Sequence, residues 1–153
     1  MTYPICDMCA SSGVLCNGCQ KKLDDGRISD LDVAVSRFLA HQDISGYERL
    51  KEAENGVFLF AERALVPKII GYSGKTVKEL SKRLGKRVIV IEDDASLNEM
   101  IDAVVRPSKA VALNTVYKGD GSESLKVVLS QPMREPGDIA LLEALIGMSI
   151  AVE

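Results

Sequence analysis

The segment from Gly56 to Glu92 limits the possible folds of this chain more than any other part of the sequence. Two short apolar runs, residues 57–61 and 88–91, lie at its ends and are rich in β-branched or aromatic residues, which predicts buried strands. Two helical patterns lie between these runs, and a short stretch that contains Gly71 and Gly74 interrupts them. The sequence therefore predicts two buried strands joined by a helix, a glycine-containing turn and a second helix.

The positive charge of the chain is concentrated in the same segment. From Arg63 to Arg87 there are eight Lys and Arg residues and one acidic residue, Glu79. This stretch carries a net charge of +7 while the whole chain carries −3, so the remaining residues together carry −10. Such an asymmetry favours an anionic partner that is bound at one place. A solvated helix face without a binding role explains the same charges equally well.

All four cysteines lie within the first nineteen residues, in two C-x-x-C pairs. The cysteines are Cys6, Cys9, Cys16 and Cys19. The spacing lets two thiolates of one tight turn reach the same ion, and two pairs complete a tetrahedral site for one structural zinc ion. Six residues separate the pairs, a short gap for a zinc site, so we expect a minimal knuckle or a very small ribbon within residues 1–27. The metal is expected to supply much of the folding free energy of this head, and residues 21–27 are expected to form a linker.

Two other chemistries are open to these cysteines. Disulfides need an oxidising compartment, and the first residues lack the basic and apolar regions of a secretory signal, so we expect a cytoplasmic protein with reduced thiols. A redox C-x-x-C pair normally opens a helix within a βαβ unit, and no such pattern surrounds these pairs. No apolar run approaches the length that spans a membrane. Structural zinc is therefore the favoured interpretation.

The residues before and after the central turn follow regular patterns. We expect Ser29 to cap a helix over residues 30–41, and residues 44–54 to form an edge strand that turns at Asn55 and Gly56. The remaining expected elements are a short helix over residues 64–70 with Pro67 in its first turn, and a helix over residues 75–84 that ends at Gly85. The expected order is therefore helix, strand, strand, helix, helix, strand.

The central turn reads Ile69-Ile70-Gly71-Tyr72-Ser73-Gly74-Lys75, and it lies between two short expected helices with a strand on each side. Over residues 29–93 this arrangement resembles a KH domain, and the order αββααβ resembles its type II form. Two glycines let the backbone approach a phosphodiester without a Cβ clash, and the N–H groups of the second helix point at the phosphates. In KH domains this loop clamps about four nucleotides of a single strand.

The resemblance implies a set of RNA-binding residues. The implied clamp is Gly71, Tyr72, Ser73, Gly74 and Lys75, and the implied backbone contacts are Lys68, Lys78, Lys82 and Arg87. The bases would lie on an apolar groove built from Val66, Ile69, Ile70, Val77, Leu80 and the last strand. A P-loop is the rival interpretation of Gly74-Lys75-Thr76, but it needs a glycine where Ile69 stands and a strand directly before the turn. A helix–turn–helix packing unit without an RNA role is the other alternative.

The last third of the chain repeats the expected order with one helix missing. We expect Ser96 to cap a helix over residues 97–105 that stops at Pro107, followed by strands over residues 110–117 and 124–129. A helix over residues 138–146, capped by Gly147, and a strand over residues 148–152 complete the order αββαβ. No G-x-x-G is present here, because residues 133–137 stand in its place and are followed by Asp138, which would repel phosphate.

Residues 104–111, Val-Val-Arg-Pro-Ser-Lys-Ala-Val, resemble the entry to the second module of NusA, a transcription factor with tandem KH modules. The expected organisation is thus α+β, with an archaeal NusA-like pair of modules behind an added cysteine head. The expected domains are 1–27, a zinc knuckle or ribbon with its linker; 28–94, a type II KH domain; and 95–153, a degenerate KH-like domain.

The resemblance implies a single-stranded RNA-binding protein that acts in transcription elongation or termination, or in RNA processing. We expect binding rather than catalysis, with no small-molecule substrate, because the sequence offers no Ser/His/Asp or Cys/His group and its one histidine, His41, stands alone. The alternative is an adaptor whose zinc head docks on RNA polymerase, a ribosome or an RNA-processing complex, with the KH fold as scaffold.

Overall fold

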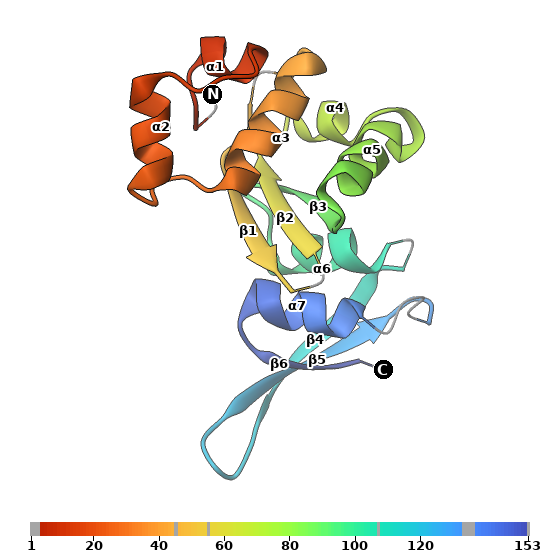
Figure 1. Ribbon diagram of the computed structural model, residues 1–153. Helices are drawn as coiled ribbons and strands as arrows, with labels where there is room; N and C mark the ends of the chain where they lie inside the picture. Colours follow the sequence, from red (N-terminus) through yellow and green to blue (C-terminus); the bar gives the residue numbers. More distant parts are fainter. Residues whose placement is uncertain (1–3, 45, 55, 107, 133–136, 153) are drawn as a thin grey trace. The chain divides into compact units, whose positions relative to one another are not determined.

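The computed structural model describes residues 4–44, 46–54, 56–106, 108–132 and 137–152 of the 153-residue chain. These residues form a mixed α+β structure with two three-stranded sheets, as the sequence predicts (Figure 1). The chain divides into two compact units, the first with Met1–Leu50 and Leu59–Asp94, the second with Lys51–Phe58 and Ala95–Glu153. The three expected domains stay a prediction. Among the described helices, none combines the length and the apolar composition that crossing a membrane requires.

The first sheet has the strand order β1-β2-β3, with β1 at Arg49–Ala53, β2 at Gly56–Ala61 and β3 at Arg87–Glu92. Just before β1, the N–H of Glu48 donates to the carbonyl of Phe60 at 2.8 Å, as in an antiparallel pair. All six residues of β2 are buried. The expected strands over residues 57–61 and 88–91 are confirmed as β2 and β3.

Three helices and one short 3₁₀ turn accompany this sheet. They are α3 (Asp30–His41), α4 (Val66–Ile70), η1 (Tyr72–Gly74) and α5 (Lys75–Leu84). Helix α5 packs on β3 and on α3, and α4 packs on α5 and β3 (Figure 1). The observed order is αββααβ once the 3₁₀ turn is set aside. This packing fixes the ends of α4 and α5 around the glycine turn.

The expected edge strand over residues 44–54 is wrong in its extent, because only Arg49–Ala53 form β1. Asp43 has φ of 56° and Gly46 has φ of 140°, so the chain turns before the strand instead of extending through it. Ile44 and Tyr47 are buried in this turn region. The expected hairpin turn includes Asn55, which lies outside the described residues.

Helix α3 begins as the sequence predicts. The backbone N–H of Asp32 donates to Ser29 Oγ at 3.2 Å, and the N–H of Ser29 donates to Asp32 Oδ2 at 3.0 Å, which forms a capping box. We expect Ser29→Ala to lower the free energy of unfolding by about 1 kcal/mol, because it leaves an N-terminal N–H without its acceptor. Urea denaturation measures this change. Ser29→Asp is the control that keeps a capping side chain, and an equal loss in both variants would contradict the capping role.

The cysteine head contains helices rather than a ribbon. Helix α1 spans Asp7–Ser11 and helix α2 spans Asn17–Asp24, and neither C-x-x-C pair lies on a strand. Of the two expected forms, a knuckle or a very small ribbon, the ribbon is therefore wrong. The expected linker over residues 21–27 is helical up to Asp24. A helix start aims several free N–H groups at one point, so it suits a group of sulfur ligands better than a strand does.

The second sheet has the order β4-β5-β6, from β4 (Ala110–Tyr117), β5 (Glu123–Leu129) and β6 (Ser149–Val152). Strands β4 and β5 are antiparallel, while β5 and β6 are parallel. Helices α6 (Leu97–Val105) and α7 (Asp138–Ile146) pack on each other, α6 also packs on β4, and α7 packs on β6.

The observed order in this part of the chain is αββαβ, as expected. Ser96 caps α6, since its Oγ accepts from the N–H of Glu99, and Gly147 at φ 81° ends α7. Two expectations lie outside the described residues: the helix stop at Pro107 and most of the stretch 133–137 that replaces the G-x-x-G motif. The sequence predicts that Asp138 repels phosphate, which requires an exposed carboxylate. In the structure Asp138 is buried.

Candidate functional sites

The four cysteines come together at the starts of two short helices. Cys6 is the N-cap of α1 and Cys16 is the N-cap of α2, both with extended backbone angles. Cys9 and Cys19 then occupy the third position of each helix. The two C-x-x-C pairs thus have the same local structure, because one helical turn brings the first and fourth residues to the same side.

The two pairs hold each other through reciprocal hydrogen bonds. The backbone N–H of Cys16 donates to Cys9 Sγ at 3.1 Å, and the N–H of Cys6 donates to Cys19 Sγ at 3.3 Å. All four Sγ atoms lie within 4.8 Å of one another. Tetrahedral metal–sulfur bonds of about 2.3 Å require sulfurs about 3.8 Å apart, so the cysteines are positioned to hold a metal ion. All four are free cysteines rather than disulfides.

The backbone around the sulfurs affects the acidity of the thiols. The N–H of Cys9 lowers the pKa of the Cys6 thiol, and the N–H of Cys19 lowers the pKa of Cys16 to about 7. The N–H of Cys16 lowers the pKa of Cys9 as well, but burial and the three neighbouring thiols outweigh it and raise that pKa to about 12. Two exposed thiols are therefore prepared for deprotonation, as metal ligation requires.

The cysteine head is not a separate body, because it shares a core with helix α3. Cys9 and Cys19 are buried together with Ile5, Ala10 and Val33, and Arg37 Nε donates to the carbonyl of Cys9 at 3.4 Å. Helix α1 packs directly on α3. The cysteine cluster therefore packs against the first helix of the αββααβ module, and not only against its own loops.

The glycine turn lies exposed between α4 and α5. Gly71 has φ of 77° and ψ of 177°, Ser73 has φ of 52°, and Gly74 has φ of 75° as the N-cap of α5. The N–H of Gly74 donates to the carbonyl of Gly71 at 3.2 Å, and the N–H of Lys75 donates to the carbonyl of Tyr72. No side chain caps the start of α5 among the described residues, so the positive end of the helix dipole is open to an anion. Tyr72 is 91% exposed at the tip of this turn. The turn at residues 71–74 is thus accessible to a ligand from solvent.

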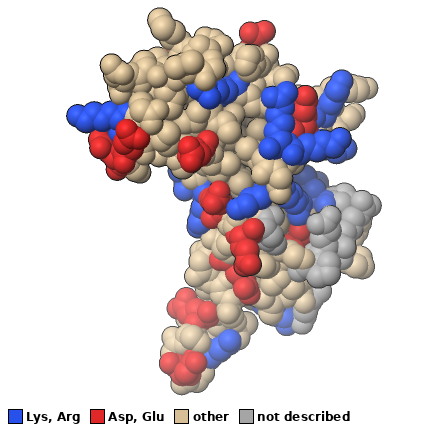
Figure 2. Space-filling model, viewed as in Figure 1, with Lys and Arg blue, Asp and Glu red and all other residues tan. Residues whose placement is uncertain are grey.

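Positive side chains surround this turn. Figure 2 shows Lys and Arg side chains gathered over the region of α4 and α5. Four of the lysines predicted to bind RNA are exposed, and none has a partner among the described residues: Lys68, Lys75, Lys78 and Lys82. Arg83 Nη2 lies 3.9 Å from Glu79 Oε1 on the same helix, in an ion pair. Arg87 also interacts with another group of the protein. Arg87 is half-buried at the start of β3, so it is less available than the lysines.

The predicted apolar groove is mostly core. Ile69 is 0% exposed and Leu80 is 1% exposed, so neither offers surface to a nucleotide base. Val66 is buried as well, whereas Ile70 and Val77 remain half-buried. The expected role of Ile69 as an RNA contact is therefore not supported by its position. Its side chain is held in the core because α4 is only five residues long and packs one face on α5 and β3.

Thr76 packs against the glycine turn, a contact that the sequence does not predict. A Cβ on Gly71 would lie 2.2 Å from Thr76 Oγ1 and 2.7 Å from Thr76 Cβ. A Cβ on Gly74 would meet nothing closer than 3.9 Å. The two glycines therefore differ, since Gly71 is required by close packing and Gly74 only by its backbone angle. The one signal in the sequence for this contact is Thr76 itself, a β-branched residue five positions after Gly71.

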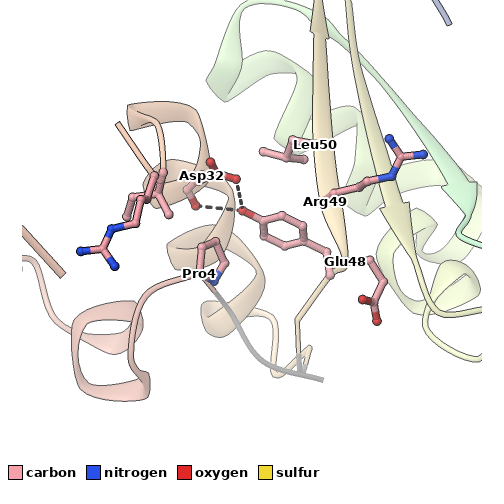
Figure 3. Close-up of a pocket in the computed structure, with 8 residues that line it drawn as sticks. Pro4, Asp32, Glu48, Arg49 and Leu50 are labelled. Carbon is pink, nitrogen blue, oxygen red and sulfur yellow. Dashed lines mark hydrogen bonds between the residues drawn. The ribbon is translucent and has the colours of Figure 1, made fainter. Parts of the chain in front are cut away.

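A small pocket lies elsewhere in the first unit. It has a volume of about 400 Å³ and lies beside β1, with Pro4, Asp32, Glu48, Arg49 and Leu50 among its lining residues (Figure 3). Tyr47 donates its hydroxyl to Asp32 Oδ1 at 2.7 Å, and burial raises the pKa of Tyr47 further than this hydrogen bond does. None of the residues predicted to bind RNA or metal lines this pocket. The hydroxyl of Tyr47 and the carboxylate of Asp32 are therefore hydrogen-bonded to each other at this pocket.

Comparison with known proteins gives a fold likeness and no family. No protein-family model matches this sequence, and no curated protein matches it. The chain is similar to the crystal structure of APE1850, with a TM-score of 0.55 and 16% sequence identity. The match covers 78% of this chain and 95% of that chain. At this level of identity the likeness concerns the fold alone.

Proposed function

We propose that this protein binds single-stranded RNA through a KH-type clamp at residues 71–75. One observation carries the proposal above all: an exposed glycine turn leads into an uncapped helix and is flanked by four exposed lysines without partners. The αββααβ order of the first module supports assignment to the type II KH form, and the αββαβ order of the last part supports a degenerate copy. The pair of modules is in keeping with a NusA-like protein.

The physical chemistry of the turn fits a phosphodiester. Gly71 and Gly74 adopt positive φ and carry no Cβ, so no side chain at these two positions obstructs the approaching backbone of the nucleic acid. The N–H groups at the start of α5 and the positive end of its dipole favour a negative charge there. Lys75 and Lys78 add charge beside the turn, and Tyr72 offers an exposed aromatic ring to a base.

The small accessible surface of the predicted groove limits the contacts that the protein can make with nucleotide bases. Only Ile70 and Val77 of the predicted groove keep accessible surface. Fewer apolar contacts to bases leave phosphate contacts as the larger share of the affinity, and phosphate contacts carry no sequence information. We therefore propose weak sequence preference and strong salt dependence for this clamp.

Zinc is the ion that we propose for the cysteine cluster, as one structural ion. Four thiolates in a tetrahedral arrangement are the preferred ligands of zinc in structural sites. A closed Cys₄ set leaves no coordination position for a substrate. The ion would therefore hold α1 and α2 on α3, and the protein would act by binding and not by catalysis. Its proposed setting is transcription elongation or termination, or RNA processing.

An adaptor role is a second candidate, and two exposed side chains of the cysteine head favour it. Met8 is 76% exposed and Val14 is 75% exposed, although both are apolar. Both belong to the part of the chain that holds the metal cluster. The head would then dock on RNA polymerase, a ribosome or an RNA-processing complex while the KH-like modules serve as a scaffold.

Removing the two lysines beside the turn separates these candidates. We expect Lys75→Ala with Lys78→Ala to weaken binding to a short single-stranded RNA of mixed sequence by at least tenfold. Each lost phosphate contact should make the slope of log Kd against log salt concentration shallower by about 0.7. Fluorescence anisotropy with a labelled RNA at several salt concentrations measures both effects. Both side chains are exposed and without partners, so the fold should be unchanged.

The matched control is Lys21→Ala with Lys118→Ala, which removes the same charge from exposed positions that do not belong to the predicted clamp. The control should retain most of the affinity and the original salt slope. If both double variants bind RNA like the unmodified protein, the clamp proposal is wrong and the adaptor candidate is favoured.

A further inference from the structure

Strand β4 is an exposed edge strand without any charge. Its eight residues read Ala-Val-Ala-Leu-Asn-Thr-Val-Tyr, and only Ala110 is buried. The strand pairs with β5 on one side and has no neighbour on its other side among the described residues. Val111, Val116 and Tyr117 are 62%, 41% and 75% exposed. An uncharged apolar edge of this length lacks the lysines, prolines and short lengths by which sheets normally avoid edge pairing.

The free hydrogen-bonding groups of this edge can be assigned from the ladder. The register between β4 and β5 is regular from Ala112 to Tyr117, with one irregularity near Val111. The N–H of Lys118 donates toward the other strand, to the carbonyl of Ser122 at 2.9 Å. Because this direction alternates along an antiparallel strand, Tyr117, Thr115 and Leu113 present their N–H and C=O groups to the open edge.

We propose that β4 pairs with β4 of a second copy of this chain, antiparallel and about a two-fold axis at Asn114. In this register Leu113 of one copy lies opposite Thr115 of the other, which matches the groups that face the open edge. Tyr117 of each copy comes beside Val111 of the other, so the two most exposed apolar side chains of the strand cover each other. Aromatic and β-branched residues are favourable cross-strand partners.

Self-complementarity is what favours a second copy over another extended partner. An antiparallel copy centred one residue earlier, at Leu113, would place Tyr117 opposite Lys109 and lose the pairing with Val111. Centred at Asn114, the register keeps Tyr117 opposite Val111 at both ends of the paired strands. The β4-β5-β6 sheet of one copy would join the same sheet of the other copy into one sheet of about six strands, an ordinary sheet size.

A charge on the two-fold axis tests the pairing. We expect the unmodified 153-residue chain to pass from the mass of one 16.6 kDa chain to twice that mass as its concentration rises through the micromolar range in sedimentation equilibrium. Asn114→Lys should weaken this association by at least tenfold, because it places two like charges directly opposite each other. Asn114 is exposed, so the monomer should fold normally. Gln42→Lys, an equal charge at an exposed position outside β4, should associate like the unmodified chain.

A cysteine at the same position tests the register. Non-hydrogen-bonded antiparallel pairs have Cα atoms about 4.5 Å apart, within the range that a disulfide spans. Mild oxidation should therefore link Asn114→Cys into a covalent dimer through position 114, whereas Gln42→Cys should form no link through position 42. Peptide mass spectrometry after proteolysis separates these links from any that form through the exposed thiols of Cys6 and Cys16. A chain that remains monomeric at all concentrations, an Asn114→Lys variant that still associates fully, or no link at position 114 would each overturn the proposal. RNA binding plays no part in these measurements.

Discussion

Removal of the metal from the cysteine cluster is expected to unfold α1 and α2 and to destabilise helix α3 with them. Structural zinc sites of this kind contribute about 10–16 kcal/mol, which is as large as the whole stability of a typical domain. Cys9 and Cys19 are buried against Val33, so the loss of the cluster opens the core next to α3. Sequence reasoning alone would confine the damage to a separate head.

Hydrogen exchange with and without a chelator measures this effect. Amides of α1 and α2 should lose their protection completely, amides of α3 should lose protection partly, and added zinc should restore both. The second sheet provides the internal control, because its strands belong to the other unit and its amides should keep their protection. Unchanged protection of α1 and α2 in the chelated protein would exclude a structural metal. Full protection of α3 in that state would exclude the shared core as the route of coupling.

Replacement of Gly71 is expected to cost far more stability than replacement of Gly74. In Gly71→Ala the new methyl group would meet Thr76 Oγ1 at 2.2 Å, at a backbone conformation with φ of 77° that alanine avoids. We expect a loss of about 3 kcal/mol in the free energy of unfolding. Gly74→Ala meets no close atom and should lose only about 1 kcal/mol from its backbone angle. Urea denaturation of both variants measures the difference, and equal losses would contradict the close packing at Thr76.

This asymmetry decides how the clamp must be tested. Paired aspartates at Gly71 and Gly74 are an obvious way to repel RNA, but the first of them would disturb the contact between the turn and α5. A loss of RNA binding in such a variant would not distinguish repulsion from misfolding. Gly71 is also needed for the packing of the turn against Thr76. The absence of the G-x-x-G motif from the last third of the chain is therefore not by itself evidence that Gly71 binds RNA.

The fold could be predicted far better than the candidate sites. Helices at residues 30–41, 75–84, 97–105 and 138–146 have the expected bounds, because capping serines and C-terminal glycines act within a few residues of the helix ends. The extent of β1 was wrong, since the turn with Asp43 in a left-handed conformation leaves no signal in the hydrophobic pattern. The predicted ribbon was wrong because C-x-x-C spacing brings two sulfurs together equally well at a helix start and in a strand turn.

The sequence by itself determined the local features: which cysteines come together, where glycines turn the chain, and where the lysines are concentrated. These features depend on spacings of a few residues, over which backbone geometry allows few choices. The tertiary structure alone decided that Ile69 is core and not groove, that Gly71 is packed against Thr76, and that the cysteine head shares its core with α3. It also decided that β4 is an exposed edge. Each of these depends on how side chains and strands from different elements fill the space between them, and no local pattern encodes that packing.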